Sequence, residues 1–211
     1  MVYFASSIYF SGEFLGKIVD EATYFCFSFL MYGIVNRSLV KLLQQEYGEE
    51  TWLLIREKSG IGDVSFLGHV QYDDQITYQI VVTASEVLQA SPDALLYNFG
   101  IHWILSTSKE EYPLIMQSSG TNLKEFFINL PNFHNRISLI YPQLSPPEFR
   151  VSHIAANSLE LHYESERQGL ESFVEGLIEG LSRHFGEKVL VEHIASRKDG
   201  SEQETFRILW Q

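Results

Sequence analysis

The sequence has only one cysteine, few basic residues and no long apolar run. Cys26 alone excludes an internal disulfide and any metal site built from several cysteines, and it fits a reducing compartment. The 15 Lys and Arg face 27 Asp and Glu, and a net charge of −12 disfavours nucleic acid and anionic membranes. The apolar stretch "YFCFSFLMYGIV" has about a dozen residues, short of the roughly 20 that span a bilayer. We therefore expect a cytoplasmic protein that binds neither nucleic acid nor membrane.

The 211 residues are most simply one domain with an N-terminal extension. A chain of this size buries roughly 70% of its unfolded surface, which is enough to enclose a sizeable ligand. An aromatic content of 14% is typical of a chain that lines a large apolar pocket. Residues 1–30 are aromatic and Ser-rich without a sustained period, and they do not form a secretory signal. They are either an extra packed helix or a translated leader before a true start at Met31. We favour the leader, which leaves residues 31–211 as the folded domain.

The spacing of apolar residues changes along the chain and predicts an α+β fold. Before Pro146 and Pro147 the apolar residues recur with a period of 3.6 residues, which indicates helices. After them the period is 2 residues, which indicates strands, apart from one helix. The expected helices cover residues 37–61, 77–89, 91–108, 121–130, Pro131 to before Pro142, and 170–185. The first has stops at Gly48 and Gly60, and the third has Ser91 as its N-cap. The expected strands cover 149–156, 159–167, 188–196 and 204–211. We predict a helical N-terminal subdomain followed by an antiparallel sheet with one helix packed on it.

The strand "LELHYESER" has one face that becomes polar along its length. Leu159, Leu161, Tyr163, Ser165 and Arg167 alternate with charged residues and share a face. The apolar start of this face predicts that it turns inward and carries a phenol, a hydroxyl and a guanidinium towards the core. A buried guanidinium requires a negative partner, which is either a protein Glu in an ordinary ion pair or an anionic ligand.

A histidine lies on the apolar face of the helix predicted to begin at Pro131. His134, Ile137 and Tyr141 share this face, so the imidazole needs a partner within the core. A backbone carbonyl is the ordinary partner. The alternative is a metal site with one histidine, because the other histidines show no close zinc-type spacing. One imidazole, a large apolar cavity and an inward arginine are what a haem requires.

Three segments together resemble the haem nitric oxide/oxygen binding (H-NOX) family of gas sensors. They are "MYGIVNRSL", "FHNRISLIYPQLSPPEF" and "LHYESERQGL", and the resemblance runs from Met31 to about Gln211. The most specific element is a Tyr-x-Ser-x-Arg motif formed by Tyr163, Ser165 and Arg167. The chain departs from the family at Pro131, where relatives often carry a polar residue.

The resemblance implies a set of cofactor-binding roles. Tyr163, Ser165 and Arg167 would hold the propionates of haem b (iron protoporphyrin IX). His134 would be the proximal iron ligand, and Pro147 would press on the porphyrin. An ordinary turn between helix and strand explains Pro147 equally well.

The resemblance also implies which side chains form the distal wall above the iron. These are Val35, Leu39, Trp103 and Phe173, and Phe173 stands where oxygen-binding members place a tyrosine. The Trp103 N–H could donate a hydrogen bond, but a space-filling indole explains it better. Since bound oxygen is held by a donor and NO needs none, we predict a sensor of NO and CO that discriminates against oxygen.

The sequence predicts a sensor module and not an enzyme. It has no nucleotide-binding loop and no kinase or cyclase signature, so its output would pass to a separate protein. The resemblance suggests a bacterial histidine kinase or a cyclic-di-GMP enzyme as that partner. Our hypothesis is that NO weakens the Fe–His134 bond and the histidine helix is displaced. Gly100 and Gly176 are candidate flexible points, although close helix packing explains both at least as well.

Two alternatives stay open from the sequence. One is an oxygen-binding sensor on the same fold. The other is a hydrolase that uses His134 with a nearby acid, although no nucleophile elbow or paired-carboxylate spacing supports it.

Overall fold

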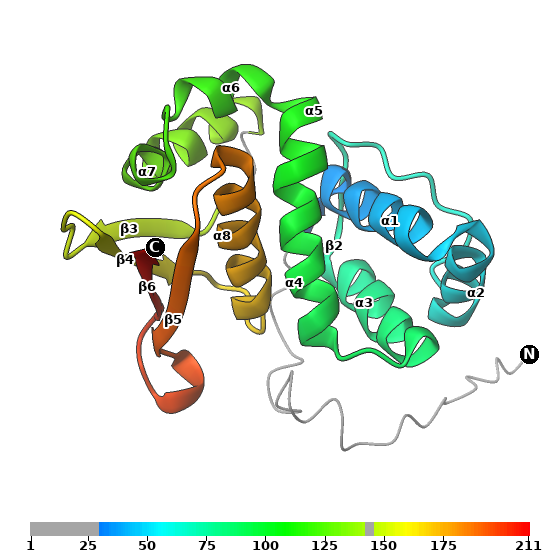
Figure 1. Ribbon diagram of the computed structural model, residues 1–211. Helices are drawn as coiled ribbons and strands as arrows, with labels where there is room; N and C mark the ends of the chain where they lie inside the picture. Colours follow the sequence, from blue (N-terminus) through cyan, green and yellow to red (C-terminus); the bar gives the residue numbers. More distant parts are fainter. Residues whose placement is uncertain (1–29, 142–145) are drawn as a thin grey trace, which may run out of the picture.

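The computed structural model describes residues 30–141 and 146–211. The helices of the N-terminal half occupy one side of the molecule, and the four-stranded sheet occupies the other side together with α7 (Leu123–Ile140). Helices α4 (Pro92–His102) and α8 (Glu171–Phe185) run side by side between the two (Figure 1). This arrangement confirms the predicted α+β class. Residues 1–29 lie outside the described part, so the proposed leader and the boundary near Met31 stay predictions. Within the described residues, no helix is both long and apolar enough to cross a bilayer.

The N-terminal half is a small helical bundle. Strand β1 (Leu30–Tyr32) leads into α1 (Gly33–Tyr47) and α2 (Glu49–Ser59), and β2 (Gln71–Asp73) leads into α3 (Asp74–Leu88). The two strands pair antiparallel. Gly48 and Gly60 have φ values of +86° and +69°, which favour glycine, and the helix stops predicted there are confirmed.

A long helical segment then runs through the centre of the molecule. Helix α4 (Pro92–His102) begins at the predicted cap, where the Ser91 hydroxyl accepts a hydrogen bond of 3.1 Å from the Ala94 amide. It continues through a π-helical segment (Trp103–Ser108) and α5 (Lys109–Glu111) and is followed by α6 (Pro113–Ser118). The π-helical segment widens the helix at the tryptophan that we expected to face a ligand, and such segments are frequent at functional sites.

Helices α4 and α8 (Glu171–Phe185) approach each other so closely that glycine is required at the contact. A Cβ atom on Gly100 would lie 2.3 Å from the Phe173 carbonyl oxygen, and one on Gly176 would lie 2.0 Å from the Tyr97 carbonyl oxygen. Close packing, and not a flexible hinge, therefore accounts for these two glycines.

The histidine helix differs from its prediction. Helix α7 spans Leu123–Ile140 without interruption and contains Pro131, so the expected helix start at Pro131 was wrong. The helix begins instead at Asn122, whose side chain accepts a 2.9 Å hydrogen bond from the Glu125 amide. Its buried face continues past the proline from Leu130 to Ile137. Burial of this unbroken apolar face outweighs the one backbone hydrogen bond that proline removes.

The C-terminal half is an antiparallel sheet of β3 (Glu148–Ser152), β4 (Ser158–Glu164), β5 (Val189–Ala195) and β6 (Glu204–Trp210). The strand order is β3-β4-β6-β5, and α8 packs on one face (Figure 1). On β4, Leu159, Leu161 and Tyr163 are at most 3% exposed, which confirms the predicted inward face.

Strand β4 is shorter than predicted. It ends at Glu164, so Ser165 and Arg167 lie in the loop before α8 and not on the strand. Pairing with β6 stops one residue earlier, where Tyr163 faces Glu204 at the start of that strand. Beyond this point the loop is free to turn its side chains independently of strand alternation.

Candidate functional site

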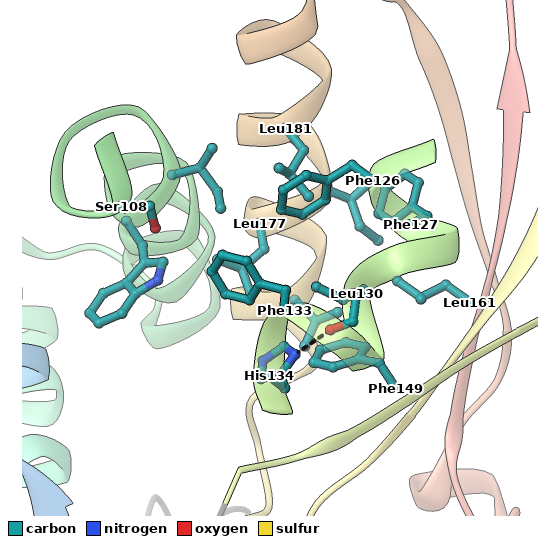
Figure 2. A pocket seen from close by; sticks show the side chains of 14 residues that line it. Ser108, Phe126, Phe127, Leu130, Phe133, His134, Phe149, Leu161, Leu177 and Leu181 are labelled. Carbon is teal, nitrogen blue, oxygen red and sulfur yellow. Dashed lines mark hydrogen bonds between the residues drawn. The ribbon is translucent and has the colours of Figure 1, made fainter. Parts of the chain in front are cut away.

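A cavity lies between α7, α8 and the π-helical segment (Figure 2). Its wall is almost wholly apolar and aromatic, and His134 and Ser108 contribute the only imidazole and hydroxyl among the lining residues. The lining residues are Trp103, Ile104, Ser108, Phe126, Phe127, Leu130, Phe133, His134, Phe149, Leu161, Val174, Leu177, Ile178 and Leu181. The cavity has a volume of about 60 Å³. An apolar wall with a few polar groups is the usual chemistry of a ligand site.

The His134 ring is held in one tautomer. Its Nδ1 lies 3.1 Å from the Leu130 carbonyl oxygen, and because a carbonyl can only accept, Nδ1 carries the proton (Figure 2). Nε2 therefore presents a lone pair. Burial lowers the pKa of His134 more than the bond to Leu130 raises it, which favours the neutral ring. The ring also stacks on Phe149 with centroids 5.1 Å apart. A neutral imidazole with its second nitrogen bonded to a carbonyl is the usual form of a metal-ligating histidine.

The negative partner of Arg167 within the protein is Asp74, at the first turn of α3. The Arg167 Nε lies 2.8 Å from Asp74 Oδ2, and the side chains are 10% and 8% exposed. The Arg167 Nη2 also donates to the Leu30 carbonyl oxygen at 3.2 Å. Arg167 thus forms a buried ion pair within the protein, but its partner is an aspartate from the helical half and not the glutamate of the alternative left open above. This ion pair ties the loop after β4 to the start of α3.

Hydroxyl groups surround this ion pair. Tyr163 is buried, and burial raises the pKa of its phenol. Tyr78, one helical turn after Asp74, has its pKa raised to about 12 by burial and then by the negative charge of Asp74. The Ser165 hydroxyl accepts a 3.1 Å hydrogen bond from the Arg167 amide. Both phenols therefore keep their protons at neutral pH and can donate to an anion.

Asp74 and Tyr78 lie beside Arg167, and the sequence prediction did not include them. Both lie in "DDQITYQ" with a spacing of four, which places them on one face of a helix. That spacing is a weak local signal. Nothing in the sequence indicates that this face meets a loop more than 90 residues later.

The residues present fit a haem. The groups near Arg167 combine a cation with hydroxyl donors, which suit two carboxylates, and His134 offers a nitrogen lone pair from an apolar wall. Within residues 30–141 and 146–211, no three His, Cys, Asp or Glu side chains form a group that could hold a metal ion. Pro147 is partly buried just before β3, a position compatible with both of its expected roles.

The four residues expected on the distal wall come together in one apolar cluster. Leu39 is buried there, and Val35, Trp103 and Phe173 pack against it. The Phe99 ring connects the two aromatics, with centroids 5.1 Å from Phe173 and 6.1 Å from Trp103. None of the four offers a hydroxyl group.

Ser108 is a third residue that the prediction missed. It lies at the end of the π-helical segment, lines the cavity and is 1% exposed. Its hydroxyl has no hydrogen-bond partner in the part of the chain that the structure describes. A buried hydroxyl without a partner is costly, so Ser108 is a candidate donor to a ligand in the cavity.

Comparison with known sequences identifies relatives over most of the chain. The family model described as Haem-NO-binding matches residues 32–193. The soluble guanylate cyclase gcy-31 of Caenorhabditis elegans is 27% identical over 163 residues, which is 77% of this chain and 23% of the relative. The soluble guanylate cyclase gcy-32 of the same organism is 31% identical over 157 residues, or 72% of this chain and 23% of the relative. The chain thus spans about a quarter of the length of these relatives.

Comparison with solved structures identifies the same fold. An H-NOX protein from S. oneidensis in the Fe(II)NO ligation state superposes with a TM-score of 0.78 at 20% identity, covering 86% of this chain and 99% of that one. A mutant of the T. tengcongensis H-NOX protein gives 0.76 at 24% identity, with coverage of 86% and 98%. The matched region is the sensor domain of its relatives and not a catalytic one. The chain belongs to the haem-NO-binding (H-NOX) family of haem-based gas-sensor domains.

Proposed function

We propose that this chain binds haem b through His134 and senses nitric oxide. The observation that carries the proposal is the fixed, neutral tautomer of His134, which directs a lone pair from the wall of an apolar cavity. When bound, haem supplies a ferrous iron with an open position for a diatomic gas. The b type is favoured because one cysteine without a Cys-x-x-Cys-His motif cannot anchor haem covalently.

The propionates of the cofactor would lie at the polar end of the site. Arg167, Tyr163 and Ser165 would hold them, with Tyr78 as a further donor. Asp74 would fix the direction of the Arg167 guanidinium. Two carboxylates attached to an apolar ring are costly to bury without such partners.

The chain's own residues favour NO and CO over oxygen. Phe173 offers no hydroxyl at the position where oxygen-binding relatives carry a tyrosine, and the wall around it is apolar. A gas that depends on a hydrogen-bond donor is therefore held weakly, whereas NO is not.

Helix α7 would carry the signal. His134 lies on it, and its buried face packs in the same core as the sheet. Loss of the bond at His134 would release the C-terminal turns of α7 from the cavity wall. The helix would then be in equilibrium between a docked and a released position. A gas ligand shifts this equilibrium only by the difference between its affinities for the two positions. The receiver would be a separate cytoplasmic protein such as a histidine kinase or a cyclic-di-GMP enzyme.

Ser108 favours a second candidate function, which is oxygen sensing. Its buried, unpaired hydroxyl lines the same cavity as His134 and Trp103, so it is a hydroxyl donor of a kind that the four expected wall residues do not provide. If the Ser108 hydroxyl holds oxygen by a hydrogen bond, the affinity for oxygen should fall when Ser108→Ala removes that hydroxyl.

Absorption spectra of the reduced, haem-loaded protein test both candidates. Under NO we expect a five-coordinate spectrum, because His134 is released, and in air we expect no stable oxygen complex. A six-coordinate NO spectrum at equilibrium contradicts release of His134. A stable oxygen complex that disappears in Ser108→Ala establishes the second candidate in place of the first.

A further inference from the structure

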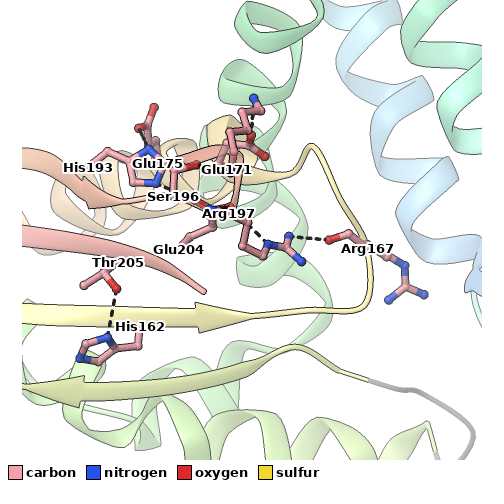
Figure 3. A network of polar contacts seen from close by, with 10 residues as sticks. His162, Arg167, Glu171, Glu175, His193, Ser196, Arg197, Glu204 and Thr205 are labelled. Atoms are coloured by element: carbon pink, nitrogen blue, oxygen red, sulfur yellow. Dashed lines mark hydrogen bonds and ion pairs between the residues drawn. The ribbon is translucent and has the colours of Figure 1, made fainter. Parts of the chain in front are cut away.

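A buried carboxylate lies at the base of the hairpin formed by β5 and β6. Glu204 is the first residue of β6 and lies beside His193 and Arg197 (Figure 3). It is 1% exposed. His193 Nε2 donates to its Oε2 at 2.8 Å, and the backbone amide and the Nε of Arg197 each lie 3.3 Å from its Oε1. Burial alone would raise the pKa of Glu204, but hydrogen bonds from His193, Ser196 and Arg197 outweigh burial and hold it below its usual value. Glu204 therefore stays charged and anchors the Arg197 side chain.

The other end of Arg197 reaches the loop that follows β4. Its Nη1 donates to the Ser165 carbonyl oxygen at 2.7 Å, and its Nη2 donates to the Arg167 carbonyl oxygen at 2.9 Å. One planar guanidinium thus joins two carbonyls two residues apart. Figure 3 shows the Arg197 guanidinium directed at the Arg167 backbone. The Arg167 side chain points the other way, to Asp74.

A second contact joins the same hairpin to the far end of this loop. Lys198 forms an ion pair with Glu171, the first residue of α8. The loop of residues 165–170 is therefore fixed at its start by Arg197 and at its end by Lys198. Both cations follow β5 directly, in the short 3₁₀ turn Arg197–Asp199.

We propose that Arg197 is a positioning residue for the propionate site, since it fixes the backbone that carries Ser165 and Arg167 while Glu204 holds it in place. This inference rests on the proposed haem site. Arg197 and Glu204 both lie beyond residues 32–193, the part that the family model matches. Neither belongs to the Tyr-x-Ser-x-Arg motif.

Amide hydrogen exchange in the haem-free protein tests the positioning itself. Arg197→Lys keeps the charge but cannot donate in parallel to both carbonyls. Amide exchange within residues 165–170 should therefore be about tenfold faster, which is the effect expected for loss of one charged hydrogen bond. Arg183→Met is the control, because Arg183 forms an exposed pair with Glu179 on α8. Unchanged exchange at residues 165–170 in Arg197→Lys, or equal acceleration in the control, overturns the inference.

The haem dissociation rate of the loaded protein tests the consequence. We expect the rate to rise about tenfold in Arg197→Met, to rise less in Arg197→Lys, and to stay unchanged in Arg183→Met. The Raman bending modes of the propionates should shift in the two Arg197 variants only. If Arg197→Met does not fold, Arg197→Lys decides. A wild-type protein that takes up no haem contradicts the proposed function, whereas a haem-loaded Arg197→Lys with unaltered dissociation and Raman bands contradicts this inference alone.

Discussion

At the scale of single residues, the site depends on how a few polar side chains are oriented within an apolar core. The Leu130 carbonyl fixes the His134 tautomer, and Asp74 fixes the direction of Arg167. His134 and Arg167 were predicted from the sequence because each interrupts an apolar pattern. Asp74, Tyr78 and Ser108 were missed, because their roles depend on contacts between elements far apart in the chain.

Removal of Asp74 should be costly because it leaves the Arg167 guanidinium without its buried partner. Breaking a buried ion pair in this way typically lowers the free energy of unfolding by about 3–5 kcal/mol. Urea denaturation of haem-free Asp74→Ala measures the loss. Asp63→Ala is the control, since Asp63 is 91% exposed in its pair with Arg56 and should change stability by about 0–1 kcal/mol. Similar losses in both variants would show that the Asp74–Arg167 pair contributes no more than a surface pair.

A hydroxyl on the distal wall should give the protein oxygen affinity. In Phe173→Tyr a phenol would donate to bound oxygen, and one such hydrogen bond of about 1–1.5 kcal/mol corresponds to roughly tenfold tighter binding. Oxygen titration of the reduced, haem-loaded variant measures this change, with Phe173→Leu as the control for altered packing. No gain in affinity would mean that Phe173 does not face the gas.

At the scale of elements, local signals placed the helix and strand boundaries well wherever a cap or a glycine determines them. The Ser91 cap and the stops at Gly48 and Gly60 are of this kind. Two boundaries were wrong where tertiary contacts override the local signal. Helix α7 continues through Pro131 because its apolar face stays buried on both sides, and β4 ends early because its partner strand ends.

Pro131 should weaken α7 at the turn before His134. Alanine restores the N–H that proline lacks and removes the clash of its ring with the preceding turn, so Pro131→Ala should raise the free energy of unfolding by about 1–3 kcal/mol. Thermal and urea unfolding of the haem-free protein measure the gain. Asn132→Ala, at an exposed neighbour, should gain no more than about 0.7 kcal/mol from helix propensity. A destabilised Pro131→Ala would indicate instead that the packing of α7 requires the proline.

At the scale of the whole molecule, two layers from different halves of the chain meet at the site. The change of apolar period after Pro147 predicted these layers and the helix on the sheet. The sequence could not predict their docking, in which Asp74 from the helical half meets Arg167 from the sheet half. For the hairpin that carries Arg197 and Glu204, the sequence predicted two strands and a turn but not the contacts of these two side chains. A buried Glu at the start of a strand has no local signature in a sequence.

Stability in acid should depend on Glu204. The pKa of Glu204 is lower in the folded protein than in the unfolded chain, where it is about 4.3. The charged carboxylate therefore stabilises the fold fully above about pH 4.3, and this stabilisation is lost as the pH falls through the pKa of the folded state. Urea unfolding over a series of pH values should show a shallower loss of stability below about pH 4.3 in Glu204→Gln than in the wild type. Glu202→Gln, at an exposed site two residues away, should behave like the wild type. Parallel curves for Glu204→Gln and the wild type would contradict a charged Glu204 in the fold.

The central claim is that His134 holds a haem in this fold, and a haem titration of the haem-free protein followed by absorption tests it most directly. We predict a Soret band that saturates at one haem per chain in the wild type, and in His134→Gly a displaced band that returns towards the wild-type position when imidazole is added. A wild-type protein that stays colourless, or a His134→Gly variant with an unaltered Soret band, would contradict the account.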